Sequence, residues 1–397
     1  MKIETIRLKN FKVFQDVEIR DIPAFCVVVG ANGSGKSTFF DVFHFLKDCL
    51  VFNVTTALQT RGGFREVVSR EHGNESIEIE IQFRTLINKA NRLVTYLLEI
   101  TQDDKSRPVV EREILRYKRG AHGLPFHFLD YRRGKGFAIT NEEDFDKAEE
   151  KLLRGEQPLN STDTLAIKGV GQFQRFKAAN TFRQFIENWN VSDFHINLAR
   201  GSKDAAGPSE HLSTSGDNLQ LAANFLYENH LETFNLILEK MRRRVPGMGN
   251  VTPEPTADGR LLLKFQDGSF RDPFIDKYVS DGTIKMFAYL VLLHDPNPHP
   301  LLCVEEPENQ LYPRLLAELA EEFREYAQRG GQVFVSTHSP DFLNAVELDE
   351  VTWLSKQDGY TQIRRAKDDA QLRAFMEAGD QMGYLWKEGF FEGADPR

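Results

Sequence analysis

The sequence predicts an α/β fold with a parallel core sheet and an antiparallel lobe near the N-terminus. The continuous apolar run 25–29 leads into a glycine-rich loop and then an apolar helix, as expected for a strand buried on both faces. Residues 76–83 (SIEIEIQF) alternate strictly between apolar and polar, which indicates a half-exposed antiparallel strand. From residue 284 to residue 336 helical and strand patterns alternate, and this order is typical of a parallel sheet.

Length and composition limit the class of protein. A chain of 397 residues is long enough for one large α/β domain with an inserted lobe, or for two domains. The formal charge of −9 argues against a wholly basic nucleic-acid coat. The N-terminus has no signal-peptide pattern and the apolar run 286–293 is too short to span a bilayer, so we expect a soluble, cytoplasmic protein without a membrane partner. Cys26, Cys49 and Cys303 form no C-x-x-C pair and are expected to be buried free thiols.

The remaining elements follow from local patterns along the chain. Asp-Gly turns at residues 258–259 and 267–268 predict hairpins around strand 261–265. No repeat or sustained heptad appears, so we predict no long coiled coil. The other expected elements are strands 3–8, 17–22, 93–100, 301–304 and 333–336, a basic turn-rich segment 108–136, and helical segments 141–189, 218–244 and 314–328. We therefore divide the chain into an N-terminal region of residues 1–104, an inserted basic and mainly helical region of residues 105–245, and a C-terminal region of residues 246–397.

The glycine-rich loop after the first core strand fits the pattern G-x-x-x-x-G-K-[ST]. Its glycines let backbone N–H groups approach phosphates, while Lys36 supplies a positive charge and Ser37 a hydroxyl ligand for Mg²⁺. A chance glycine-rich turn is the alternative, but a buried strand before the loop and an apolar helix after it favour nucleotide binding. The expected nucleotide-binding residues are Gly30, Asn32, Gly33, Ser34, Gly35, Lys36, Ser37 and Thr38.

Two adjacent carboxylates end the apolar strand 301–304. Successive strand residues point in different directions, so Glu305 and Glu306 can serve different purposes. We expect Glu305 to engage Mg²⁺ and Glu306 to orient or deprotonate the water that attacks the γ-phosphate. Solvated acids at a strand end are the alternative.

A histidine follows the second buried strand, 333–336. Since α/β sheets gather ligands at strand ends, we expect His338 to contact the γ-phosphate rather than to be structural. His294 and His299 lie in a proline-rich loop without ligand spacing, so we predict no metal site beyond the Mg²⁺ of the nucleotide.

As a set, the motifs IRLKNFKVF, GANGSGKST, VSDGT, LLCVEEPENQLYP and FVSTHSPDFL resemble the ABC-type ATPases of the SMC/RecF/OLD-like branch, in the form of a P-loop head without a C-terminal nuclease domain. They occur in the family's order and cover the first 50 and roughly the last 120 residues. The resemblance implies that two heads sandwich two ATP molecules. It also implies that Ser280 and Gly282 of one head contact the γ-phosphate held by the other, with Thr283 beginning a helix aimed at it.

The resemblance assigns further positions and also shows departures. Residues 308–309 fall at the dimer-contacting D-loop, His338 matches the switch histidine, and Lys12 falls where a basic residue near the nucleotide is common. Gln82 is the candidate for the Q-loop glutamine. The signature reads VSDGT instead of LSGGQ, which places the acidic Asp281 beside an anion, and Glu305 replaces the usual aspartate.

The basic segment is a candidate nucleic-acid surface. Tyr117 and Tyr131 interleave with the cations, which suits backbone contact combined with stacking on bases; a solvated hairpin face is the alternative. DNA contact would involve Arg132, Arg133 and Lys135. The basic residues of the segment are Arg107, Arg112, Arg116, Lys118, Arg119, Arg132, Arg133 and Lys135, against the acids Glu111, Glu113 and Asp130.

These observations lead to one function and two alternatives. We expect an ATPase with Mg²⁺ and ATP as cofactors, acting as a switch through an ATP-closed homodimer or a higher oligomer. Few residues follow His338, so an effector is expected to be a separate protein. The leading hypothesis is the sensor ATPase of an anti-phage or DNA-surveillance system paired with a nuclease or toxin. The alternatives are a RecF-like DNA-repair clamp and a nucleotide-gated scaffold without nucleic-acid contact.

Overall fold

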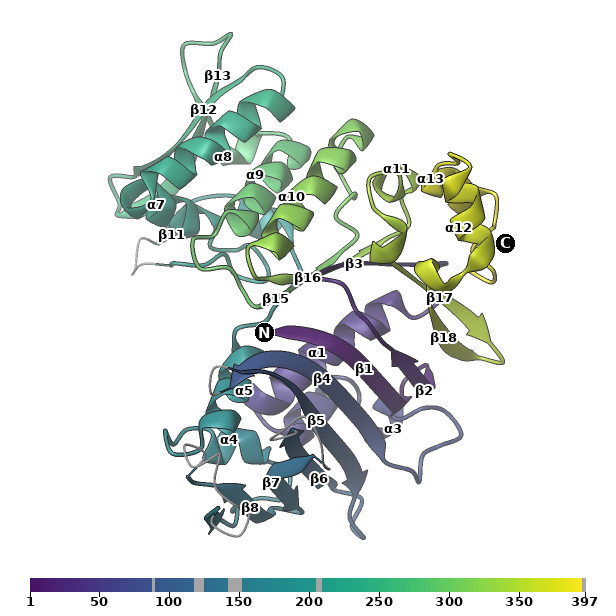
Figure 1. Cartoon of the computed structure of the whole chain (residues 1–397). Coiled ribbons are helices and arrows are strands. Elements are labelled where there is room, and N and C mark those ends of the chain that lie inside the picture. The colour runs from purple at the N-terminus through teal and green to yellow at the C-terminus, as the bar shows by residue number, and fades with distance from the viewer. Residues whose placement is uncertain (88–89, 118–124, 142–151, 205–208, 395–397) are drawn as a thin grey trace. The chain divides into compact units, whose positions relative to one another are not determined.

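The computed structural model describes residues 1–87, 90–117, 125–141, 152–204 and 209–394 (Figure 1). The expected bases Lys118 and Arg119 lie outside the described residues. The chain forms two compact units, each treated separately below. Unit 1 comprises Met1–Trp189 and Glu347–Arg397, and unit 2 comprises Asn190–Val346.

A large antiparallel sheet forms the first layer of unit 1. Its eight strands follow the order β2-β1-β4-β5-β6-β7-β8-β9. In β4 Ile77, Ile79 and Ile81 are buried while Glu78 and Glu80 are half-buried, so the alternation seen in the sequence gives the sheet one apolar face. The strands are β1 (Lys2–Phe11), β2 (Phe14–Ile19), β4 (Ile77–Ile87), β5 (Ala90–Gln102), β6 (Pro108–Tyr117), β7 (Phe126–Arg132), β8 (Lys135–Ile139) and β9 (Arg154–Glu156).

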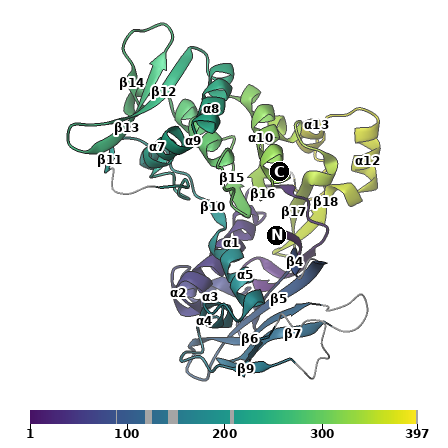
Figure 2. The ribbon, with the colours of Figure 1, turned by 60° about the vertical axis from the view of Figure 1, so that its left-hand side comes forward.

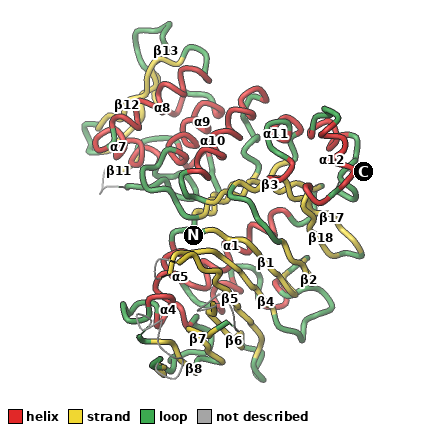
Figure 3. The backbone as a smooth tube through the Cα atoms, in the orientation of Figure 1, coloured by secondary structure: helices red, strands yellow, loops and turns green. Residues whose placement is uncertain are grey.

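Helices α1 and α5 of unit 1 cover the apolar face of this sheet, as the red segments beside the yellow strands of Figure 3 show. Phe182 of α5 stacks on Phe83 of β4 with ring centroids 4.6 Å apart, and Phe45 of α1 lies 5.5 Å from Phe11 of β1. The aromatic layer buries large side chains and fixes both helices against the strands. The helices of this unit are α1 (Lys36–Val51), α2 (Val54–Gln59), α3 (Phe64–Val67), α4 (Ala166–Val170), α5 (Lys177–Glu187), α12 (Ala370–Glu377) and α13 (Met382–Lys387).

The strand before the glycine-rich loop belongs to a second set of strands in unit 1. All six residues of β3 (Phe25–Gly30) are buried, as its unbroken apolar sequence predicts. β17 (Val351–Gln357) runs parallel to β3, and β18 (Tyr360–Arg365) pairs antiparallel with β17. The C-terminal strands therefore lie beside the beginning of the nucleotide loop.

Unit 2 is built on three parallel strands in the order β10-β15-β16. These are β10 (Asn190–Ser192), β15 (Leu301–Glu305) and β16 (Gln332–Thr337). Glu305 is in register with Ser336, so β15 and β16 end side by side. This parallel register brings residues 305–306 close to residue 338, although 32 positions separate Glu306 from His338 in the chain.

Helices and a hairpin complete unit 2 (Figure 2). α9 is buried at every position from Thr283 to Leu293, which explains its nearly unbroken apolar sequence. The helices are α6 (Ile196–Ala199), α7 (Leu219–Asn229), α8 (Leu231–Arg244), α9 (Asp281–Leu293), α10 (Leu316–Gln328) and α11 (Pro340–Leu343). The hairpin sheet consists of β11 (Lys203–Asp204), β12 (Met248–Pro255), β13 (Arg260–Asp267) and β14 (Phe274–Ile275), with the predicted Asp258–Gly259 turn between β12 and β13.

Two segments differ from the sequence prediction. The beginning of the insertion, expected to be a basic, turn-rich segment over residues 108–136, contains strands, because β6, β7 and β8 extend the antiparallel sheet of unit 1. The helical pattern 218–244 is two helices, since His230 ends α7 and begins α8 with an extended φ of −138°. The division into regions at residues 104 and 245 stays a prediction.

Two smaller expectations concern helix length and thiols. Within the described residues the longest helix is α1 with 16 residues, and none there combines the length and apolar character that crossing a membrane requires. All three cysteines are buried free thiols, as predicted.

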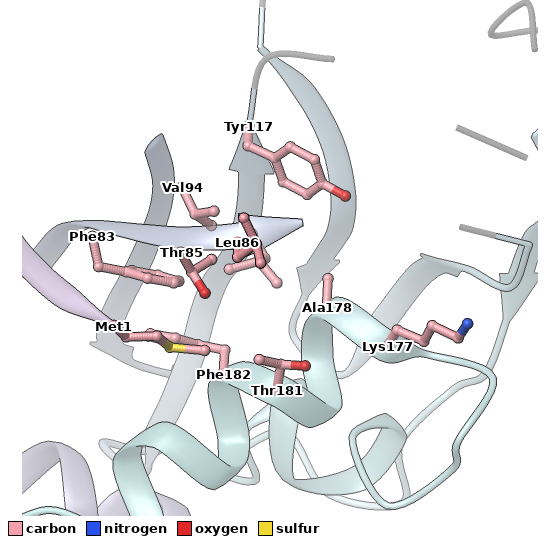
Figure 4. A pocket seen from close by; sticks show the side chains of 11 residues that line it. Met1, Phe83, Thr85, Leu86, Val94, Tyr117, Lys177, Ala178, Thr181 and Phe182 are labelled. Carbon is pink, nitrogen blue, oxygen red and sulfur yellow. The ribbon is translucent and has the colours of Figure 1, made fainter. Parts of the chain in front are cut away.

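A cavity of about 190 Å³ opens in unit 1 beside β4 and α5 (Figure 4). Met1, Phe83 and Phe182 lie close together in its wall, and Lys177 extends away from them. Its lining is mostly apolar and contains none of the predicted nucleotide-binding or catalytic residues.

Candidate functional site

The loop between β3 and α1 has the backbone that a phosphate cradle needs. Gly33 and Gly35 have φ of 77° and 105°, in the region that favours glycine. A Cβ atom at Gly35 would lie 2.9 Å from Thr361 Oγ1 and 3.0 Å from Val13 Cγ2. One at Gly30 would lie 2.3 Å from Ser34 Oγ. The backbone conformation thus favours glycine at positions 33 and 35, and the lack of space favours it at positions 30 and 35.

Lys36 places a buried cation on this loop. Its Nζ donates to Gly30 O at 2.7 Å and to Ala31 O at 3.3 Å. Ser34 Oγ is buried and has no hydrogen-bond partner among the described residues. Ser37 lies in the first turn of α1, where a hydroxyl can ligate a cation beside a phosphate. A loop with an orphaned hydroxyl, a held ammonium group and a helix N-terminus fits a nucleotide phosphate.

A residue that the sequence did not single out supports the loop from β18. Thr361 is fully buried, its Oγ1 donates to Ser34 O at 2.7 Å, and its N donates to Val13 O at 2.8 Å. The C-terminal strand pair therefore holds both the nucleotide loop and the turn between β1 and β2. Thr361 and Ser34 are 327 positions apart, so no local sequence pattern could predict this contact.

The turn after β1 brings Lys12 to α1. Lys12 has a φ of 50° and its Nζ donates to Asp41 Oδ2 at 2.6 Å, while Arg61 donates to Asp41 Oδ1 at 2.8 Å. Lys12 is thus paired with Asp41, which lies one turn of α1 beyond Ser37. Gln82 lies in the middle of β4 and donates to Glu80 at 3.0 Å.

In unit 2 the two predicted carboxylates lie at the end of β15. Glu305 is the last residue of the strand and is exposed. Glu306 adopts a φ of 44°, a left-handed conformation that costs a non-glycine residue of order 1–3 kcal/mol. Its N donates to Ser336 O at 2.9 Å, which holds this turn against β16. Strained backbone of this kind is concentrated at functional sites.

Glu306 and His338 meet at the ends of the two strands. The distance from His338 Nδ1 to Glu306 Oε1 is 3.3 Å, and Asn309 Nδ2 donates to Glu306 Oε2 at 3.1 Å. The carboxylate is thus held between an imidazole and an amide while a third of its side chain is exposed. This geometry suits a carboxylate that accepts a proton from water.

Glu308 positions the histidine, a role that its place in a D-loop motif did not suggest. Its Oε1 accepts from Thr337 Oγ1 at 2.7 Å and from His338 N at 3.0 Å, and its Oε2 is buried without a partner among the described residues. Lys285 of α9 donates to Asn309 O at 2.7 Å. Burial lowers the pKa of Lys285 to about 8, and the negative charges of Glu308 and Glu306 oppose that shift.

The VSDGT element forms the N-terminus of α9. Ser280 is the N-cap, with its Oγ accepting from Thr283 N at 3.3 Å. A Cβ at Gly282 would lie 2.8 Å from Gln310 O, so only glycine lets the segment after β15 pass this close. Ser280, Gly282 and Tyr312 line a groove of about 1000 Å³.

Arg200 forms an ion pair with Asp281, the unusual acidic residue of this element. Its guanidinium donates to Asp281 Oδ1 and to Asp276 O at 2.6 Å, and its side chain is only 16% exposed. The charge of Asp281 is therefore paired, which leaves the N-terminus of α9 suitable for an anion.

The basic segment exposes fewer aromatic rings and unpaired cations for contact with nucleic acid than its sequence indicates. The stacking prediction is wrong, because Tyr117 and Tyr131 are each only 1% exposed. Most of the cations are paired with carboxylates: Arg107 with Asp103, Arg112 with Asp130, Arg116 with Glu80 and Arg133 with Glu111. Arg132 and Lys135 are exposed and have no carboxylate partner in the portion of the chain that the structure describes.

Comparisons with known proteins agree with these motifs. Residues 25–344 match the family model described as "AAA domain, putative AbiEii toxin, Type IV TA system". The chain belongs to this family. An ATP/GTP phosphatase of Helicobacter pylori (strain ATCC 700392 / 26695) is 21% identical over 357 residues, 87% of each chain. The chromosome partition protein Smc of Methanococcus voltae is 32% identical over 82 residues, and the match spans 20% of this chain but only 6% of that protein.

The fold is that of an SMC head. The crystal structure of an Smc head bound to the C-winged helix domain of ScpA superimposes with a TM-score of 0.54 at 16% identity, covering 92% of this chain and 98% of that one. The expected SMC- and ABC-like ATPase family and head fold are thereby confirmed. The roles of individual residues stay predictions.

Proposed function

We propose that this protein binds and hydrolyses ATP as a switch that closes as a homodimer around two Mg-ATP. The observation that carries the proposal is the β3–α1 loop, with its left-handed glycines and buried Lys36. Backbone N–H groups, the N-terminus of α1 and one ammonium group together provide what a triphosphate requires. Ser37 and Glu305 would hold Mg²⁺, which neutralises phosphate charge when bound.

The hydrolytic step is assigned to Glu306. Its carboxylate, held by His338 and Asn309, would accept the proton of the attacking water. His338 then orients Glu306 and faces the γ-phosphate, while Glu308 keeps the histidine in place.

The homodimer is assigned to the groove at the N-terminus of α9. Ser280 and Gly282 would contact the γ-phosphate held by the loop of the second copy. The exposed position of Ser280, the helix N-terminus and the paired charge of Asp281 support an anion at this place.

For the biological role we propose a sensor or regulator in an anti-phage or DNA-surveillance system with a separate nuclease or toxin effector. The description of the matching family, which names a putative toxin of a type IV TA system, supports this context. A RecF-like DNA clamp is the second candidate, favoured only by the exposed Arg132 and Lys135. A scaffold without nucleic-acid contact is the third.

The test of the catalytic proposal is Glu306→Gln, with the exposed Glu377→Gln on α12 as the matched control. We expect phosphate release to fall by about 10²- to 10⁴-fold in the first variant and to be unchanged in the control. Size-exclusion chromatography with light scattering should then show an ATP-dependent dimer of Glu306→Gln. A variant that hydrolyses ATP at the wild-type rate, or stays monomeric with saturating ATP, contradicts the proposal.

The biological role is tested with the same trapped variant. Proteins that co-purify with Glu306→Gln plus ATP, but not with Lys36→Ala, identify an effector by mass spectrometry. A nuclease or toxin supports the regulator, and DNA-stimulated hydrolysis without a protein partner supports the clamp. If neither result is obtained, the scaffold is the remaining candidate.

A further inference from the structure

Three polar side chains that are distant in sequence converge in unit 2. They are His211, from the loop before α7, Asp295, just after α9, and His299, just before β15. One ligand atom from each lies within 4.8 Å of the corresponding atoms of the other two. His211 Nδ1 lies 2.6 Å from Asp295 Oδ2, and the two imidazole centroids are 5.1 Å apart.

A fourth polar group at this place lacks a partner. The side chain of Asn190 is 3% exposed, and its Oδ1 is buried with no hydrogen-bond partner among the described residues. Its Nδ2 lies 3.4 Å from His299 Nε2, so the amide is beside the histidine pair. The same Nδ2 donates to Leu212 O at 3.4 Å, and an orphaned buried carbonyl oxygen such as Oδ1 costs of order 1–3 kcal/mol.

Hydrogen bonds hold the carboxylate of Asp295 and the main chain of both histidines. Asp295 Oδ1 accepts from Asn297 N at 2.8 Å, which leaves Oδ2 directed at His211. His211 O accepts from Asn218 Nδ2 at 2.9 Å, and His299 O accepts from Tyr326 Oη at 3.1 Å. A preorganised donor set of this kind loses little conformational entropy on binding a metal.

We propose that His211, Asp295 and His299 form a site for a divalent transition-metal ion of the zinc class, with the amide of Asn190 beside His299. Two imidazoles and one carboxylate match the donors that Zn²⁺ and Co²⁺ take in proteins, whereas Mg²⁺ prefers oxygen alone. The carboxylate of Asp295 is 4% exposed, and a divalent cation compensates this buried charge.

The position of the site indicates a structural ion. Asn190 begins β10 and His299 precedes β15, so the donors lie at the amino ends of these parallel strands. Glu305 and Glu306 lie at the carboxyl end of β15, about 20 Å away for an extended segment of six residues. The ion would tie the loop before α7 to the sheet and would not take part in phosphate chemistry.

The experiment is a titration of chelator-treated, nucleotide-free full-length protein with Co²⁺, followed by visible absorption, with Zn²⁺ as competitor. We expect one Co²⁺ per chain and its displacement by Zn²⁺. His299→Gln and the nearly isosteric Asp295→Asn should weaken binding about tenfold or more. His195→Ala is the matched control, because His195 forms an exposed ion pair with Asp193, 3.2 Å apart, in the same unit.

A second readout distinguishes a lost ligand from a lost fold. Zn²⁺ should raise the melting temperature of the wild type and of His195→Ala, but not that of His299→Gln or Asp295→Asn. Circular dichroism shows whether each variant is folded. Equal Co²⁺ affinity in the wild type and in a folded Asp295→Asn protein overturns the proposal, and so does the absence of binding by the wild type.

Discussion

Thr361 shows how a single hydroxyl outside the nucleotide motif bears on the loop. We predict that Thr361→Val, which keeps the shape but removes the bond to Ser34 O, lowers the free energy of unfolding by about 1 kcal/mol. It should also weaken ATP binding, because the loop loses its fixed position. Urea unfolding and the titration of a fluorescent ATP analogue measure the two effects. Thr361→Ser retains the hydroxyl, and a serine variant as weak as the valine variant would contradict this explanation.

We expect Glu308 to affect hydrolysis through His338, whose backbone N–H donates to its carboxylate. In Glu308→Ala, His338 N and Thr337 Oγ1 lose their acceptor, so the histidine is no longer held beside Glu306. We expect kcat to fall by about tenfold with little change in KM, since a positioning group affects the transition state more than binding. Steady-state ATPase kinetics provide the measurement. Glu308→Gln keeps an acceptor and should recover most of kcat; an alanine variant that changes only KM would assign Glu308 to binding.

At the scale of elements, the N-terminus of α9 depends on a pair of charges. Removing the guanidinium in Arg200→Ala leaves Asp281 unpaired next to the expected γ-phosphate. We predict that the ATP concentration for half-maximal dimerisation rises about fivefold, which corresponds to roughly 1 kcal/mol. Light scattering across an ATP titration measures it. The double variant Arg200→Ala with Asp281→Asn removes both charges and should restore dimerisation; a double variant as defective as the single one would argue for a structural role of Arg200.

Helix α4 carries a pH-dependent cap. Glu113 is fully buried and accepts from Ala166 N, from Ile167 N at 3.1 Å and from Tyr96 Oη at 3.0 Å. Burial raises the pKa of Glu113 to about 7, and the hydrogen bonds from these donors partly offset the increase. The folded state therefore binds more protons than the unfolded state between about pH 4.5 and pH 7.

The stabilisation from this raised pKa is complete below about pH 4.5 and is lost as the pH rises through 7. The free energy of unfolding should decrease with pH in that window by up to about 1.4 kcal/mol for each unit. Urea unfolding of the wild type and of Glu113→Gln at several pH values measures the difference. The glutamine variant removes this titration, so the stability gap between the proteins should change across the window. A constant gap would contradict the linkage.

Local patterns predicted most elements, whereas long-range contacts could not be read from them. The buried strand β3, the loop after it, and the ends of β15 and β16 follow from apolar runs with glycine or polar residues at their ends. Thr361, Arg200 and Glu113 carry no such signal, because each finds its partner through the tertiary fold. Strands 108–139 were missed because basic side chains and turn residues hid their alternation.

The same limit explains the site at the amino ends of β10 and β15. Asp295 and His299 are four positions apart in a proline-rich loop. This spacing alone does not indicate a metal site, because the third donor, His211, is distant in the sequence. No local pattern in the sequence therefore indicates these donors, which the fold brings together from three segments.

Because most of the described cations of the basic segment are paired with carboxylates, we expect little contact between unit 1 and nucleic acid. Among the described bases of the segment, only Arg132 and Lys135 are without carboxylate partners, and these two should neutralise about two phosphates. We predict a shallow dependence of DNA affinity on salt, with a logarithmic slope of about −2. Fluorescence anisotropy over a series of salt concentrations measures it, and Arg132→Glu with Lys135→Glu should abolish the dependence. A slope several times steeper would favour the clamp.

The buried thiols offer a way to follow the two halves of the molecule without introducing a label. Cys26 and Cys49 belong to unit 1 and Cys303 to unit 2, and burial raises the pKa of Cys26 to about 11, so alkylation must await local or global opening. Peptide mapping after timed exposure to iodoacetamide would therefore report opening rates separately for each half. Bound nucleotide should slow the alkylation of the cysteines in whichever unit it stabilises. The three native thiols would then report the opening rate of each unit.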